Sequence, residues 1–211
     1  AFEFVNFRYY GGGVELPSAI FARLSPLDEY ATRHLFCGLI GVTFVVATWR
    51  LARRVGGTRA GALAALFLIV SPAFYGHIFI NARDVPFATG ITLSLLLALR
   101  AQAELPKIRL RNLVLFGLTL GWTISVRVGG VLGILFWLMP MVLWLAARAR
   151  AGASWRELAG HARHIAVSLL IAGGVAYAVI AVLWPWAIQA PLNPLRALTM
   201  GIAPIWRARR V

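Results

Sequence analysis

Residues 128–147 have the sequence VGGVLGILFWLMPMVLWLAA, in which no side chain carries a charge. An α-helix of this length extends about 30 Å, which matches the hydrocarbon thickness of a lipid bilayer. Residues 165–186 form a second uncharged run, and residues 60–71 are almost entirely apolar. The whole chain is 60% hydrophobic with a mean hydropathy of +0.78, whereas soluble domains are about 45–50% apolar. The sequence therefore predicts an all-α fold, a polytopic transmembrane helix bundle.

Six membrane spans are predicted from the apolar pattern and its interruptions. They cover residues 34–50, 60–78, 85–100, 112–126, 128–147 and 164–186. Residues 1–33 are predicted to be an outer-face loop with a short interfacial helix at Leu16–Leu24, and residues 187–211 an outer-face tail. The chain starts at Ala1 without Met or a signal peptide, and we expect it to be an internal fragment of a longer protein.

The net charge of +14 has a distribution that favours membrane topology over nucleic-acid binding. Three basic clusters lie between pairs of apolar runs: Arg50, Arg53, Arg54 and Arg59; Arg100, Lys107, Arg109 and Arg111; Arg148, Arg150, Arg156 and Arg163. This alternation follows the positive-inside rule and places the three clusters in the cytoplasm of a cell (inner) membrane protein. Anionic lipid headgroups are their expected partners, and no nucleic acid is expected.

Several local features carry predictions of their own. Residues 112–126 extend only about 22 Å, so Arg127 is expected at or inside the outer membrane boundary. Pro140 is expected to kink the fifth span. Gly173 and Gly174 are expected to allow close helix packing. The lone Cys37 excludes a disulfide framework and a cysteine-based metal site.

Two histidines accompany the third basic cluster: His161 lies within it and His164 directly follows it. They are predicted to lie in a solvated cytoplasmic loop.

Asp84, in the segment Asn81-Ala-Arg-Asp84-Val-Pro86, is the acidic residue that the sequence marks for function. It is the only acid between Glu29 and Glu104, and apolar sequence flanks it on both sides. A carboxylate in or beside the membrane is costly, which makes a functional site one interpretation. The other is that Asp84 caps a helix starting near Val85, with a proline in its first turn.

The residues around Asp84 suggest what such a site does. An outer-face carboxylate can accept a proton from an attacking hydroxyl or bind a divalent cation. Arg83 would favour the ionised carboxylate or bind a phosphate, and His77 and Asn81 are further candidates for substrate or phosphate binding. Arg127 needs a water-filled cavity, a carboxylate or an anionic ligand, or else snorkels to the headgroups.

Four motifs resemble the integral-membrane glycosyltransferases of the C superfamily. They are Arg33-His34, Arg53-Arg54-Val-Gly-Gly57, Ser71-Pro72-Ala-Phe-Tyr-Gly-His77 and Asn81-Ala-Arg-Asp84-Val-Pro86-Phe-Ala. The chain is most similar to the bacterial branch of family 39, the dolichyl- or polyprenyl-phosphate-mannose mannosyltransferase-like proteins. Trp184-Pro-Trp186 followed by Asn193-Pro-Leu195 also looks like that branch.

The resemblance implies an enzyme that moves a sugar, mannose or a similar hexose or pentose, from a polyprenyl-phosphate carrier to an acceptor. Transfer is implied to occur with inversion on the non-cytoplasmic face, to a lipid, glycan or protein. Asp84 matches the acid of the second outer loop, which binds acceptor or metal. The principal acidic base of the family precedes the tyrosines that match Tyr9-Tyr10, so it is expected upstream of Ala1 unless Glu15 or Glu3 takes that role.

Two other classes of function stay open at this point. A transporter or flippase subunit for a lipid-linked or anionic substrate would line its path with Asp84 and Arg127. A membrane anchor would use Asp84 only as a helix cap. The sequence names neither the sugar nor the acceptor. It leaves metal dependence and oligomeric state open as well, with no cofactor assigned beyond the candidate divalent cation.

Overall fold

The computed structural model describes residues 11–190, 193, 196 and 197, and all regular elements in these residues are helical. The α-helices are α1 (Glu15–Leu24), α2 (Glu29–Ile69), α3 (Pro72–His77), α4 (Asp84–Ala103), α5 (Leu110–Val126), α6 (Leu132–Arg150), α7 (Trp155–Leu183) and α8 (Pro185–Ile188). A 3-10 turn, η2 (Val128–Val131), joins α5 to α6. Glu3, Tyr9, Tyr10 and Leu195 lie outside the described residues.

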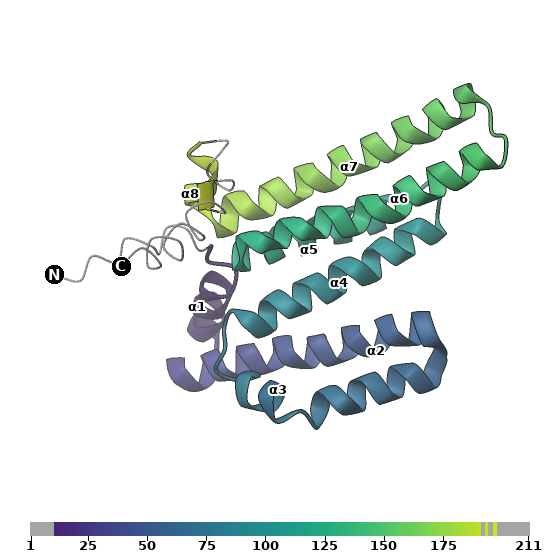
Figure 1. Ribbon diagram of the computed structural model, residues 1–211. Helices are drawn as coiled ribbons and strands as arrows, with labels where there is room; N and C mark the ends of the chain where they lie inside the picture. Colours follow the sequence, from purple (N-terminus) through teal and green to yellow (C-terminus); the bar gives the residue numbers. More distant parts are fainter. Residues whose placement is uncertain (1–10, 191–192, 194–195, 198–211) are drawn as a thin grey trace, which may run out of the picture.

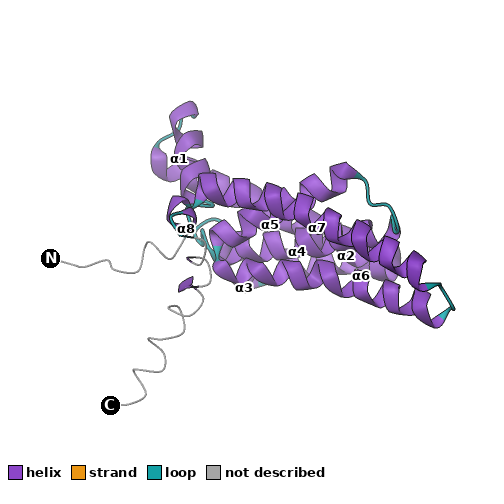
Figure 2. Cartoon of the chain, turned by 90° about the horizontal axis from the view of Figure 1, so that it is seen from above, coloured by secondary structure: helices purple, strands orange, loops and turns teal. Residues whose placement is uncertain are grey.

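The long helices run side by side between two ends of a bundle (Figure 1). Four of them, α2, α4, α6 with its preceding turn, and α7, are long and apolar enough to cross a membrane, and α5 is a shorter apolar helix. The first end, here called the Asp84 end, holds α1, α3 and α8 (Figures 1 and 2). The opposite end, where α4 finishes, is called the Arg100 end. The predicted all-α membrane bundle is confirmed.

The first two predicted spans lie in one helix that reverses direction. Gly57 interrupts α2 with φ 81° and ψ −177°, a conformation that glycine adopts without the steric cost of a Cβ. The two arms of α2 pack against each other, because a Cβ at Gly61 would lie 2.9 Å from the carbonyl oxygen of Trp49. The second arm ends at Ile69, and Ser71 then caps α3, so the span predicted at 60–78 is broken before its end.

α5 occupies the centre of the bundle and packs against α4 and α7. Its Phe116 ring stacks on Trp137 of α6 at a centroid distance of 5.8 Å, and both side chains are fully buried. Gly117 and Gly121 let α7 approach, since a Cβ at either would lie 2.5 Å from a carbonyl oxygen of α7. The prediction for Gly173 and Gly174 is wrong, because nothing lies within 4 Å of a Cβ at either position.

The last two long helices differ from the predicted spans in where they begin. α6 is continuous from Leu132 to Arg150 with Pro140 inside it. α7 begins at Trp155, nine residues before the predicted span, because Ser154 and Glu157 form a capping box. His161 and His164 therefore lie on a helix and not in a solvated loop, and the His161 ring contacts Trp144 at 5.0 Å between centroids.

A glycine-rich segment fastens α1 to the Asp84 end. The Gly12 N–H donates to the Leu183 carbonyl at 2.8 Å, and the Gly13 N–H donates to the Ser125 carbonyl at 3.1 Å. Trp122 Nε1 donates in turn to the Gly13 carbonyl at 2.8 Å. A Cβ at Gly13 would lie 2.8 Å from the Ser125 carbonyl carbon, so this close approach requires glycine. The segment before α1 is thereby fixed against the ends of α5 and α7.

Candidate functional site

Asn81, in the loop between α3 and α4, organises the polar residues of the Asp84 end. Its Oδ1 accepts the backbone N–H of Asp84 at 2.8 Å and that of Arg83 at 3.1 Å. These bonds satisfy two of the free N–H groups at the start of α4. Asn81 therefore caps this helix, and the alternative in which the Asp84 side chain is the cap does not hold.

The amide nitrogen of Asn81 links two side chains that the sequence singled out. It donates to Asp84 Oδ2 at 2.8 Å and lies 3.2 Å from Nδ1 of His77. Because Oδ1 faces two N–H donors, the NH₂ group must face the carboxylate and the imidazole. His77 Nδ1 then accepts a hydrogen bond, which places the proton of the neutral ring on Nε2.

Arg127 completes the arrangement from a different part of the chain. Its Nη1 lies 2.8 Å from Asp84 Oδ1, so each carboxylate oxygen of Asp84 has its own partner. Arg127 is the extended residue between α5 and η2. The turn folds back on α5 through Gly130, where a Cβ would lie 2.6 Å from the backbone nitrogen of Ile124. Local backbone geometry thus aims the guanidinium at the start of α4.

The ion pair is open to its surroundings. The side chain of Arg127 is 43% exposed and that of Asp84 is 58% exposed, so screening limits the contribution of the pair to stability to about 0–1 kcal/mol. A guanidinium has five N–H donors, and an ionised carboxylate has about four lone-pair sites. Both groups therefore keep capacity for further ligands: an anion on Arg127 and a hydroxyl on Asp84.

Comparison with known proteins identifies a family. The profile for dolichyl-phosphate-mannose-protein mannosyltransferases matches residues 18–172, which is well over half of the chain and includes the whole Asp84–Arg127 site. The chain belongs to this mannosyltransferase family. No curated protein and no solved structure matches it. The family carries out glycosyl transfer of the mannosyltransferase type in a membrane, and the resemblance seen in the motifs is confirmed at this level.

Two residues proposed for the mannosyltransferase site are not members of the Asp84–Arg127 ion pair. Glu15 is the exposed first residue of α1 at the same end, but within the described part of the chain it forms no hydrogen bond or ion pair with the site residues. Arg83 contributes its backbone N–H to Asn81, whereas the ion pair of Asp84 is with Arg127. The tertiary fold therefore pairs Asp84 with a distant arginine in preference to its sequence neighbour.

Among the described residues, Asp84 has few of the partner ligands that a divalent cation requires. Ca²⁺ and Mg²⁺ require several oxygen ligands, and no three His, Cys, Asp or Glu side chains come together in residues 11–190, 193, 196 and 197. The cationic Arg127 already occupies one oxygen of the carboxylate. We derive no step of the mannosyltransferase reaction through a metal ion.

Sequence reasoning missed the residues that support Arg127. Trp122 and Ser125, on the last turns of α5, hold the backbone of Gly13, and the side-chain hydroxyl of Ser125 donates to the Gly121 carbonyl at 2.8 Å. Val14 then packs with Val126 in a small apolar cluster beside Phe87 of α4. The only sequence signal was the position of a Trp and a Ser just before an arginine that is flanked by apolar residues.

Proposed function

We propose that the protein transfers a sugar from a polyprenyl-phosphate carrier to an acceptor hydroxyl at the Asp84 end, on the non-cytoplasmic face. The observation that carries this proposal is the exposed ion pair between Asp84 and Arg127 in a chain of the mannosyltransferase family. The pair brings together the two charges that such a transfer requires. The carboxylate of Asp84 would bind the attacking hydroxyl, and the guanidinium of Arg127 would bind the leaving phosphate.

In the proposed reaction the acceptor oxygen attacks the anomeric carbon of the sugar from the side opposite the phosphate. A new C–O bond forms, the bond to the phosphate oxygen breaks, and the carrier phosphate leaves with the electron pair. The hydroxyl proton passes to a carboxylate, and inversion of the anomeric centre follows from the single displacement. Asp84 is proposed to hold the acceptor hydroxyl, directly or as a partner of a further acidic base such as Glu15.

Arg127 is proposed to stabilise the charge that develops on the leaving phosphate. A guanidinium matches phosphate oxygens through a planar pair of donors, and it acts most strongly where water is excluded. His77, with its proton on Nε2, is proposed as a second donor to the phosphate, and Arg83 as a further cation near it. Asn81 acts as a positioning residue, because it holds both Asp84 and His77.

The test is Asp84→Asn in the protein in its native membrane, assayed with polyprenyl-phosphate mannose labelled in the sugar. We expect transfer of label to fall about 100-fold, the lower range for loss of a catalytic acid–base group. Asp28→Asn is the matched control, since Asp28 caps α2 through Oδ1 at 3.0 Å and Asn caps equally well. The control should keep near-wild-type transfer.

Three outcomes contradict the proposal. If Asp84→Asn transfers label at a near-wild-type rate, Asp84 is not part of the transfer site. Failure of the wild-type protein to release label from this carrier contradicts the donor. Movement of intact labelled carrier across the membrane without release of the sugar favours the alternative of a transporter or flippase subunit.

A further inference from the structure

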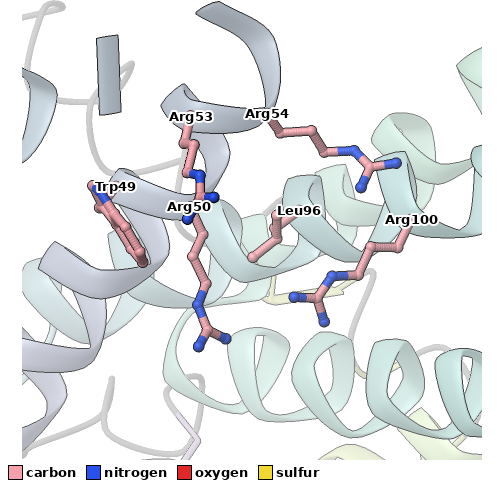
Figure 3. Close-up of a pocket in the computed structure, with 6 residues that line it drawn as sticks. All are labelled: Trp49, Arg50, Arg53, Arg54, Leu96 and Arg100. Atoms are coloured by element: carbon pink, nitrogen blue, oxygen red, sulfur yellow. The ribbon is translucent and has the colours of Figure 1, made fainter. Parts of the chain in front are cut away.

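A pocket lined by arginines lies at the Arg100 end of the bundle, opposite the Asp84–Arg127 site. It has a volume of about 420 Å³ and is lined by Trp49, Arg50, Arg53, Arg54, Leu96 and Arg100. Figure 3 shows the arginines of α2 and Arg100 of α4 gathered around it. The two basic clusters that supply them are separated by more than 40 residues of sequence, and the packing of α2 on α4 brings them together.

No described carboxylate neutralises the positive charge of this pocket. Within the described part of the chain, none of the four arginines forms an ion pair with a carboxylate. Arg54 is held in place because its Nη2 donates to the Leu99 carbonyl at 3.0 Å, and the Arg53 guanidinium lies 5.4 Å from the centre of the Trp49 ring. Clustered guanidinium groups that lack a counter-charge are suited to bind a phosphate through several donors.

An apolar groove continues from the arginine pocket toward the middle of the bundle. This second cavity, about 300 Å³ in volume, shares Arg50, Leu96 and Arg100 with the pocket. Its remaining walls are mostly apolar and come from three helices: Thr43, Val46 and Ala47 of α2, Leu93 and Leu97 of α4, and Leu115 and Thr119 of α5. On α4, Leu93, Leu96, Leu97 and Arg100 recur at intervals of one, three and four positions, which places them on one helix face. On α2, Val46 and Ala47 precede Arg50 by four and three positions and share its face. A ligand that fills both cavities needs an anionic head and a hydrocarbon chain.

We propose that the arginine pocket binds an anionic phospholipid of the cytoplasmic leaflet, with the headgroup phosphate among Arg50, Arg54 and Arg100 and one acyl chain in the apolar groove. Charge complementarity selects an anionic head over a zwitterionic one. The groove selects a lipid over free phosphate. The site is separate from the sugar-transfer site, since Asp84 and Arg100 are sixteen residues apart on α4, about 24 Å along its axis.

The first test measures how much phosphatidylglycerol, compared with phosphatidylcholine, the full-length protein retains in native mass spectrometry. The double variant Arg50→Gln/Arg100→Gln should bind phosphatidylglycerol about 25-fold more weakly, because each arginine near an anionic headgroup contributes a factor of about five. The matched control is Arg148→Gln/Arg156→Gln, which removes the same charge from the same end outside the pocket. Unchanged binding in the first variant, or an equal loss in both, overturns the proposal.

A second variant tests the groove and does not depend on the arginines. Val46→Trp keeps all four charges and fills the groove from a position where Val46 is 42% exposed. It should weaken phosphatidylglycerol binding, whereas competition by inorganic phosphate should be as weak as with the wild type. Unchanged lipid binding in Val46→Trp overturns the assignment of the groove. Displacement of the lipid by inorganic phosphate at equal concentration would mean that a soluble anion is the ligand, which also overturns it.

Discussion

At the scale of single residues, an asparagine takes the helix-capping role that was one of the two alternatives for Asp84. Asn81 caps α4 through Oδ1, so the Asp84 carboxylate is not used by the helix and keeps Arg127 as its charged partner. An exposed ion pair contributes little to stability. A ligand-binding role therefore explains the pair better than a contribution to folding stability does.

Arg127→Gln tests this explanation by comparing stability with activity. We expect thermal stability in detergent to change by no more than about 1 kcal/mol, the range for exposed ion pairs. Sugar transfer should fall about tenfold or more, because the leaving phosphate loses its cation. The control is Arg109→Gln, which removes the ion pair of the exposed Arg109 with the partly buried Glu104 at the opposite end and should leave transfer unchanged.

The double variant Asp84→Asn/Arg127→Gln sharpens the comparison. If both residues act on one transition state, the loss in the double variant should be smaller than the product of the two single losses. Strictly multiplicative losses would mean that the two residues act independently, and a large loss of stability would mean that the pair is structural.

At the scale of helices, small residues decide which neighbours α5 has. Gly117 and Gly121 lie one turn apart and face Ala172 and Ala176 of α7. In a membrane, apolar side chains gain nothing from leaving lipid for the interior, so close backbone packing is the main source of helix association. This contact fixes the end of α5 next to the end of α7, and both ends then hold the Gly12–Gly13 backbone near Arg127.

Gly121→Val tests the packing of α5 on α7. A Cβ there would lie 2.5 Å from the Ala176 carbonyl oxygen and 2.7 Å from Val179 Cβ, so we expect a loss of about 1–3 kcal/mol from overpacking. Denaturant unfolding in detergent micelles measures it. Gly173→Val is the control, because it introduces the same β-branched side chain into open space on α7. Equal losses in the two variants would show that helix propensity, and not packing, sets the cost.

At the scale of the whole molecule, the basic clusters and the proposed sugar-transfer site lie at opposite ends of the bundle. The turns at the Arg100 end lie within the basic clusters of the sequence, whereas the Asp84 end holds α1, α3, α8 and the proposed transfer site (Figure 1). The positive-inside rule predicts that the Arg100 end faces the cytoplasm. The proposed site then faces the side to which a lipid-linked sugar would be presented.

Cysteine labelling tests this orientation. Leu24→Cys lies at the end of α1 and Trp155→Cys at the start of α7, and both native side chains are 81% exposed. A membrane-impermeant maleimide added to intact cells should label the first variant at once and the second only after permeabilisation. The native Cys37 is 2% exposed and serves as the unlabelled background. The reverse labelling pattern would show the opposite membrane orientation and would contradict the proposal that transfer occurs on the outer face.

The sequence alone determined the membrane bundle, because runs of apolar residues of bilayer length have no other stable environment, and the charges between them define two faces. It also located Asp84 and Arg127, since charged residues at membrane depth are rare. The tertiary structure decided which charges meet: Asp84 with Arg127, and Arg50 with Arg100. Those pairings depend on which helices lie side by side, which is set by glycine contacts such as Gly121 against α7 and by the reversal at Gly57. The hydrophobic pattern cannot encode that choice, because apolar side chains interact about as well with lipid as with a neighbouring helix.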